Sequence, residues 1–229
     1  VNTDKVSRAT AEDEGFNLFS EASNAGKYGI LTYDNWNIYH MCIGAGLDPF
    51  VKHSEADIAA FEKVARAWFK GAKLLTDDLV AMNLALINGE IDFYLTGGTY
   101  TASPARLDGY SNVRGITPKK GPLAGGKGGI TWVEVTSVVN NPQGSPLAYD
   151  FLEYVQTPEV CHAVAFAEGT YNPVTQMGNK AVFDLFSADE LDAIQWDSLE
   201  EELSNTVDYQ INPDYDAMNK IYNEAKREA

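Results

Sequence analysis

The stretch from residue 28 to residue 36 reads YGILTYDNW and decides the fold class. Its first part is a short apolar run of β-favouring residues, which predicts a buried strand. Asp34 and Asn35 follow, and either can cap a helix that runs from about Trp36 to Ala45 and stops at Gly46. A strand that leads through a cap into a helix is half of a βαβ unit, so this stretch predicts an α/β fold.

Further helices and strands follow in alternation. Ser54 and Asp57 have the spacing of a capping box at the start of a predicted helix over 54–72. The other expected elements before residue 145 are a helix over about 77–88 and strands over 91–95, 113–116 and 130–139. Beyond residue 145 only helices are expected, over 146–156, 158–167, 180–186, 189–203 and 214–226. This order predicts an α/β domain with a helix-rich appendage.

The composition excludes several classes of function. The 33 acidic side chains outnumber the 17 basic ones, so the net charge of the 229 residues is −16. A nucleic-acid partner is disfavoured because phosphates require a basic face, and the 11% aromatic content excludes intrinsic disorder. No apolar run approaches the roughly 18 residues of a membrane span, so we expect no direct membrane insertion. The negative field attracts cations and therefore suits a cationic ligand.

The sequence lacks the short motifs that mark common catalytic and metal sites. Its three histidines show no metal-binding spacing, and there is no GxSxG nucleophile elbow. The glycine-rich run over 125–129 lacks the Lys-Ser/Thr pair of a phosphate-binding loop and is better explained as a turn. We therefore predict no catalytic residues, no metal and no cofactor.

Two strand-to-helix junctions carry candidate binding residues. At the first, Tyr33 and Trp36 can wall a pocket in which Asn35 fixes a ligand; alternatively, these residues only cap and pack a helix. At the second, Gly98, Thr99 and Tyr100 open a helix whose backbone amides suit a carboxylate or a similar anion. A tight turn that needs glycine is the alternative there. Open α/β sheets bind ligands beyond the carboxyl ends of their strands, which makes both junctions informative.

A third candidate lies on the strand expected over 130–139. Because strand side chains alternate, Trp132 and Glu134 would share one face. An aromatic ring beside a carboxylate is a receptor for an amine, since the ring attracts the cation and the carboxylate accepts a charge-assisted hydrogen bond. A core tryptophan and an unrelated surface glutamate are the alternative interpretation.

Five stretches together resemble one protein family. They are residues 1–6 (VNTDKV), 46–49 (GLDP), 86–91 (LINGEI), 131–135 (TWVEV) and 148–154 (AYDFLEY). In order and spacing the chain resembles the periplasmic solute-binding proteins of bacterial ABC transporters, of the spermidine/putrescine-binding type (extracellular solute-binding protein family 1).

This resemblance implies a periplasmic binding protein type II-like fold, in which two α/β lobes close on a ligand. It implies that the chain begins part-way through the first lobe and lacks its N-terminal part. Residues 1–27 would be a first-lobe and hinge segment, and residues 28–130 a fairly complete second lobe. Residues 131–229 would hold the returning strand and the helical end of the first lobe.

The resemblance also implies a function. The chain would be the non-catalytic substrate-binding component of an ABC importer, capturing a small, polyamine-like amine and delivering it to a membrane permease. It would be periplasmic, or extracellular and lipid-anchored in a full-length form.

The motif match implies roles for particular residues. Relatives place an aromatic residue two positions before an acid on the returning strand, where Trp132 and Glu134 stand here. The carboxylate expected at the first junction falls at Asn35 or Trp36, with Asp34 adjacent. Where relatives have a tryptophan and an aspartate, this chain has residues 97–100 (GGTY). A zwitterionic amino-acid derivative is therefore an alternative ligand, and an enzyme or a sensory domain on a similar scaffold is an alternative class.

Overall fold

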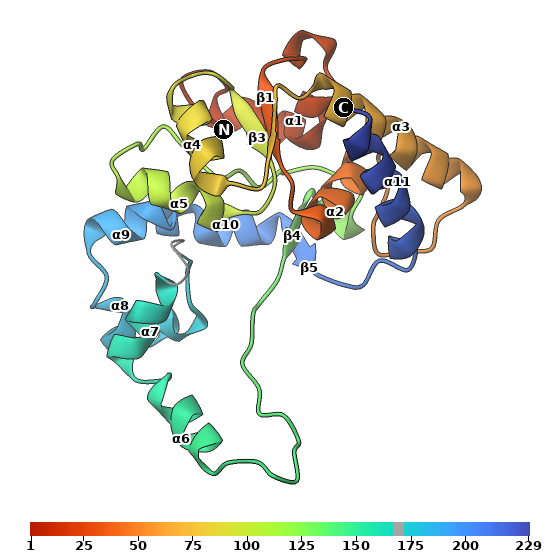
Figure 1. Cartoon of the computed structure of the whole chain (residues 1–229). Helices are drawn as coiled ribbons and strands as arrows, with labels where there is room; N and C mark the ends of the chain where they lie inside the picture. Colours follow the sequence, from red (N-terminus) through yellow and green to blue (C-terminus); the bar gives the residue numbers. More distant parts are fainter. Residues whose placement is uncertain (167–171) are drawn as a thin grey trace.

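The computed structural model of the chain describes residues 1–166 and 172–229 and shows a mixed helix and sheet protein (Figure 1). At its centre is a parallel sheet with the strand order β2-β1-β3, formed by β1 (Tyr28–Leu31), β2 (Leu74–Thr76) and β3 (Phe93–Leu95). The strand predicted at residue 28 is thus the central one. The parallel α/β arrangement expected from the first stretch of sequence is confirmed at this level.

Helices connect and cover the strands. The chain passes from β1 to β2 through α2 (Asp34–Gly44) and α3 (Glu55–Gly71), and from β2 to β3 through α4 (Leu79–Ile87). Helix α5 (Thr99–Leu107) follows β3 directly. The expectation that Asp34 or Asn35 caps α2 is wrong, because the helix already begins at Asp34 and its N-cap residue makes no side-chain capping bond.

The capping box predicted at the start of α3 is confirmed. The Ser54 hydroxyl accepts a hydrogen bond from the Asp57 amide, and the Asp57 carboxylate accepts one from the Ser54 amide at 2.9 Å. These bonds satisfy two amides that a helix start otherwise leaves unpaired.

We expect the substitution Ser54→Ala to lower the free energy of unfolding by about 1 kcal/mol, because it removes the hydroxyl half of the capping box. Urea denaturation followed by circular dichroism measures this loss. Ser111→Ala is a matched control, since Ser111 is exposed and its hydroxyl makes no hydrogen bond with the described residues. An equal effect of the two substitutions would contradict the prediction.

Apolar clusters pack on the two faces of the sheet. On one face, α2, α3, the 3₁₀ segment at Gly15–Phe19 and α11 (Tyr215–Arg227) bury large side chains against β1 and β3. On the other face, α4 and α5 pack on β1 and on the segment before β3. The largest fully buried side chains of the first cluster are Trp68, Tyr28, Tyr222, Phe61, Phe69 and Phe93.

A second, two-stranded parallel sheet joins β4 (Gly129–Thr131) to β5 (Thr206–Asp208). The strand predicted over 130–139 is therefore wrong beyond Thr131, because β5 offers no further partner residues and residues 133–139 are exposed. The strand predicted over 113–116 is likewise wrong, since only an isolated bridge between Asn2 and Val113 forms there.

The C-terminal part is helical, as predicted, but its helices are shorter. They are α6 (Leu147–Tyr154), α7 (Pro158–Ala165), α8 (Lys180–Phe183), α9 (Ala188–Ala193), α10 (Leu199–Ser204) and α11. The helix predicted over 189–203 is split at Gln195, which adopts a left-handed conformation and hydrogen-bonds the backbone of Gly115. Ala167, the predicted end of another helix, lies outside the described residues.

Several short elements were not predicted from the sequence. They are β2, β5, helix α1 (Arg8–Glu14) and the 3₁₀ segments Gly15–Phe19, Ala22–Asn24, Ala124–Gly126 and Thr175–Gly178, whereas the 3₁₀ segment Trp196–Ser198 falls within the helix predicted over 189–203. Short elements such as these show too few turns or alternations to give a periodic pattern.

The boundaries of the second lobe, placed at residues 28 and 130 from the sequence, stay a prediction. Helix α11 packs against α3 and α2, and α9 packs against α5, so the last segment contacts the central one at two separate places. Helices α6, α7 and α8 form an arm that the long linker after β4 joins to the body (Figure 1). A small core around Cys161 and Phe186 packs α7 and α8 against α9, and α6 has no buried residues. Among the described helices, not one has the length and apolar character that crossing a bilayer requires.

Candidate functional site

The carboxyl ends of all three central strands open onto one cavity of about 1440 Å³. Tyr33 follows β1, Asp77 and Asp78 follow β2, and Thr96 follows β3, and each of these residues lines the cavity. In parallel α/β sheets ligands bind at this edge of the sheet, especially at the point where the strand order reverses. Strand β1, with β2 on one side and β3 on the other, has that arrangement.

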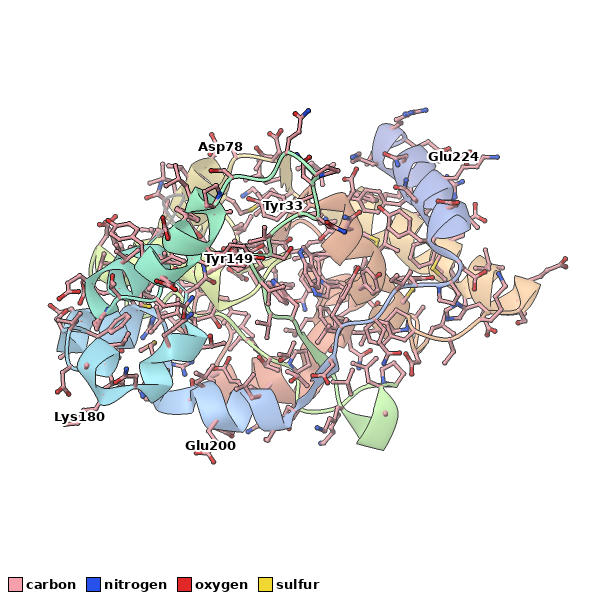
Figure 2. The ribbon with its side chains drawn as sticks, turned by 90° about the horizontal axis from the view of Figure 1, so that it is seen from below. Tyr33, Asp78, Tyr149, Lys180, Glu200 and Glu224 are labelled. Atoms are coloured by element: carbon pink, nitrogen blue, oxygen red, sulfur yellow. The ribbon has the colours of Figure 1, made fainter. Side chains whose placement is uncertain are left out.

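The opposite wall comes from the distant C-terminal half. The linker after β4 contributes Trp132 and Glu134, and the arm contributes Phe151, Leu152 and Val155. Seen from below, the linker passes in front of the face that holds Tyr33 (Figure 2), and Figure 1 shows that its loop and α6 lie well below the central sheet. Seven of the eight predicted binding residues line this cavity: Tyr33, Trp36, Gly98, Thr99, Tyr100, Trp132 and Glu134.

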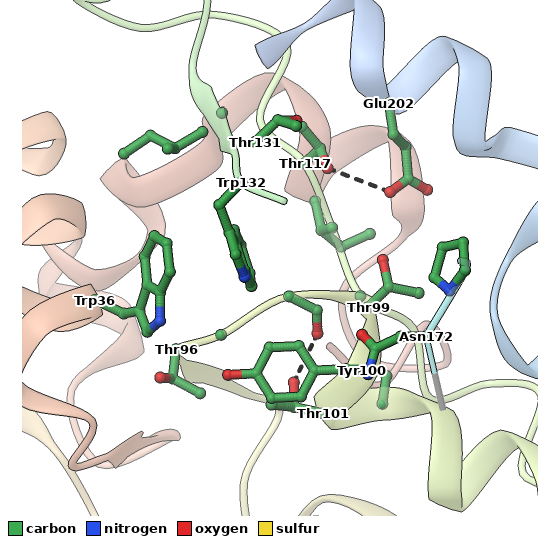
Figure 3. Close-up of a pocket in the computed structure, with 18 of the residues that line it drawn as sticks. Trp36, Thr96, Thr99, Tyr100, Thr101, Thr117, Thr131, Trp132, Asn172 and Glu202 are labelled. Atoms are coloured by element: carbon green, nitrogen blue, oxygen red, sulfur yellow. Dashed lines mark hydrogen bonds between the residues drawn. The ribbon is translucent and has the colours of Figure 1, made fainter. Parts of the chain in front are cut away.

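An aromatic cluster forms one corner of the cavity (Figure 3). The ring centroids of Trp36 and Trp132 lie 4.1 Å apart, and Tyr100 meets Trp132 edge-on at 6.1 Å. Gly98 lies beside them, since a Cβ at this position would be 3.3 Å from Cη2 of Trp132. The three stretches of sequence that carry the predicted binding residues thus meet here. We call the group of Trp36, Gly98, Tyr100 and Trp132 the aromatic corner.

Trp132 reaches this corner for a reason other than the one expected. The alternation argument is wrong, because residues 132 and 134 lie beyond β4 and form no strand face. The Trp132 ring is held instead by packing on Trp36, and Glu134 is exposed in the linker where it still lines the cavity. Burial raises the pKa of the Tyr100 hydroxyl, and the neighbouring Tyr33 and Tyr94 and the charge of Glu134 add to this shift.

Asn35 does not belong to the cavity. Its side chain is exposed, and its Oδ1 accepts a hydrogen bond from the hydroxyl of Tyr215 on α11. It borders a separate hollow of about 670 Å³ with Tyr39, Lys52 and Asp214. The placement of Asn35 among the ligand-contacting residues is therefore not supported by the geometry.

Asp77 and Asp78 are cavity residues that sequence reasoning missed as candidates. Asp78 caps α4, because its Oδ1 accepts hydrogen bonds from the amides of Val80 at 2.8 Å and Ala81 at 3.1 Å. Asp77 and Glu134 make no hydrogen bond or ion pair with the described residues. The sequence signal for a site here is the pair of acidic residues that directly follows the strand Leu74–Thr76. This strand has only three residues and no alternation of polar and apolar side chains, so the sequence pattern does not reveal it.

Neutral polar groups line the wall below and beside Trp132 (Figure 3). The Thr96 hydroxyl oxygen is buried and has no hydrogen-bond partner, and the hydroxyls of Thr99 and Tyr100 also lack one among the described residues. Thr101 and Thr117 differ, since their hydroxyls donate to the Gly98 carbonyl at 2.8 Å and to Glu202 at 3.2 Å. The hydroxyls of Thr99 and Tyr100 are therefore available to a ligand, whereas the unpartnered hydroxyl of Thr96 is covered by the surrounding residues.

His40 extends the aromatic stack behind the corner. Its ring lies 4.8 Å from that of Phe16 and 6.4 Å from that of Trp36. Burial lowers the pKa of His40 to about 4, so the imidazole is neutral at pH 7 and adds no positive charge. The charged lining near the aromatic corner is consequently acidic.

The described part of the chain holds no group of three or more histidine, cysteine, aspartate or glutamate side chains placed to bind a metal ion. Both cysteines are buried and unpaired. Comparison of the chain with models of protein families and with curated proteins finds no match.

Proposed function

We propose that the chain is the solute-binding component of a bacterial ABC importer and that it captures a small amine in the cavity at the strand ends. The observation that carries this proposal is the aromatic corner with the nearby carboxylate of Glu134, which has no partner among the described residues. A second such carboxylate, Asp77, lines the same cavity. A non-catalytic capture role needs no more than such a receptor. The partners are the amine and the membrane permease, and the compartment is the periplasm or the outer face of an anchoring membrane.

The chemistry of the corner suits an ammonium group. The face of Trp132 attracts a cation through its electron-rich π-system. Glu134 supplies a charge-assisted hydrogen bond, and the net charge of −16 raises the local concentration of cations. Because the linker that carries Trp132 and Glu134 faces the strand ends, a bound amine would contact both sides of the cavity.

The wider architecture supports this proposal without deciding it. A parallel sheet with the order β2-β1-β3 and a cavity at its carboxyl edge are features that a periplasmic binding protein type II-like lobe requires. The sequence resemblance to spermidine/putrescine-binding proteins adds the class of solute. Ligand capture would then shift an equilibrium between open and closed forms, as in other hinged binding proteins.

A zwitterionic ligand is the second candidate. Helix α5 begins at Thr99 with Gly98 as its N-cap residue, and no side chain caps it. The N-terminal amides of an uncapped helix attract a carboxylate. An amino acid with its amine at Glu134 and its carboxylate at α5 would use both features.

Isothermal titration calorimetry with putrescine, spermidine and 4-aminobutyrate tests the proposal. We expect saturable binding of at least one amine, weakened by added salt because exposed charges take part. Butyrate, which lacks the amine, is the control and should give no heat. If butyrate binds and the amines do not, the proposed function is wrong.

A further inference from the structure

Two sets of free polar groups in the cavity lining bear on the choice of ligand. The carboxylates of Asp77 and Glu134 are charged and exposed to solvent. The hydroxyls of Thr96, Thr99 and Tyr100 are neutral and belong to partly buried residues at the strand end and the start of α5. A ligand that enters the cavity therefore meets negative charge at the exposed rim and neutral hydroxyls along the inner wall.

The remaining carboxylates that line the cavity are already engaged. Asp78 accepts two amide hydrogen bonds as the cap of α4. The two oxygens of Glu202 accept hydrogen bonds from Gln195, Ser198 and Thr117. The inner wall thus offers no unengaged carboxylate to a second ammonium group.

The three hydroxyls of the inner wall favour a different ligand group from the one that a carboxylate favours. Each can donate and accept, so together they match a ligand hydroxyl or amide. Burial keeps Tyr100 protonated at neutral pH, and its hydroxyl therefore stays a donor. The two unengaged carboxylates, Asp77 and Glu134, are exposed at the rim, so an ammonium group held by these hydroxyls would lose its hydration without a direct ion pair, which is unfavourable.

We infer that the solute of this cavity carries a single ammonium group and, several atoms away, a neutral group that both donates and accepts hydrogen bonds. This inference rests on the proposed function and narrows it from polyamines to monoamines with a hydroxyl or amide end. The ammonium lies against Trp132 and Glu134, and the neutral end lies against Thr99 and Tyr100. The unpartnered Thr96 hydroxyl closes the same wall.

A matched series of four-carbon amines tests the inference by calorimetry. Butylamine, putrescine and 4-amino-1-butanol share one ammonium and one chain and differ in the terminal methyl, ammonium or hydroxyl group. We expect 4-amino-1-butanol to bind about 3- to 10-fold more tightly than butylamine, the ratio that one neutral hydrogen bond gives. Putrescine should bind more weakly than 4-amino-1-butanol. Adding 4-aminobutanamide shows whether an amide serves as well as a hydroxyl.

Two substitutions locate the effect. Thr99→Val and Tyr100→Phe each remove one hydroxyl and keep the size of the side chain. In either variant the ratio between the affinities of 4-amino-1-butanol and butylamine should fall toward one. Thr157→Val is the matched control, because the Thr157 hydroxyl bonds the Tyr154 carbonyl at 2.9 Å and lies outside the cavity lining. The control should keep the ratio of the unmodified chain.

The possible outcomes separate this inference from the proposal beneath it. If putrescine binds most tightly, or if butylamine equals 4-amino-1-butanol, the amine site stands and the inference is wrong. The inference is also wrong if the ratio survives in both cavity variants. If none of the four amines binds, the proposed function itself is overturned and the inference with it.

Discussion

Replacing Trp68 with alanine is expected to lower the free energy of unfolding by about 3–5 kcal/mol, the range for emptying a large aromatic site in a packed core. Trp68 lies on α3 with no exposed surface and packs against Phe19, whose ring centroid is 5.0 Å away. Its indole nitrogen donates to the Ser20 hydroxyl at 2.9 Å, and this acceptor would lose its donor. Urea denaturation followed by far-ultraviolet circular dichroism measures the change without depending on tryptophan emission.

Trp196→Ala is the matched control for this stability measurement. Trp196 is only half-buried and contacts Phe183 at 5.4 Å in the small core of the arm. Its replacement should therefore cost less than that of Trp68. A loss at Trp68 below about 1 kcal/mol would contradict the packing described for this core.

Gly44 allows the same contact to be tested from the other side. A Cβ at this position on α2 would overlap the six-membered ring of Trp68, so Gly44→Ala forces the two helices apart. In the double variant with Trp68→Ala, the new methyl group enters the space that the indole left. We therefore expect the double variant to lose less stability than the two single variants together. Additive losses would show that the helices do not meet as described.

The central fold was predictable from the sequence because its signals are local. The apolar run before Asp34 became β1, and the capping pattern at Ser54 started α3. Residues 132–139 show where local signals fail: they favour a strand, but strand formation needs a partner, and β5 ends at Asp208. Gln195 shows the same limit for a helix, since its contact with Gly115 lies far away in the sequence.

The candidate site was predictable in its chemistry and less so in its geometry. The sequence pattern indicates Trp36 after one strand and Trp132 on another as binding residues. Their stacking depends on the path of the linker after β4, which has no periodic sequence pattern. Asn35 appeared suitable because it adjoins Trp36, yet neighbouring residues on a helix point in different directions, and Asn35 faces Tyr215. Asp77 was overlooked because the strand before it is short.

The proposed amine site depends most strongly on Trp132, and Trp132→Ala is expected to weaken amine binding by about 10- to 100-fold. The substitution removes a cation–π attraction worth about 0.5–2 kcal/mol together with the apolar surface that the ring offers to the carbon chain. It also uncovers the face of Trp36 that the indole packs against at 4.1 Å. Calorimetry with 4-amino-1-butanol and with putrescine measures the loss.

Two further substitutions separate ring from charge at this position. Trp132→Phe keeps an aromatic face and should retain part of the affinity, whereas Glu134→Gln keeps the shape of the side chain and removes its charge. Because exposed charges are screened by salt, affinity in Glu134→Gln should depend less on ionic strength than in the unmodified chain. Circular dichroism should show all three variants folded, since Glu134 is exposed and Trp132 is only half-buried. If folded Trp132→Ala binds amines within about twofold of the unmodified chain, the aromatic corner is not where the amine binds, and the carboxylates at the rim would have to act without it.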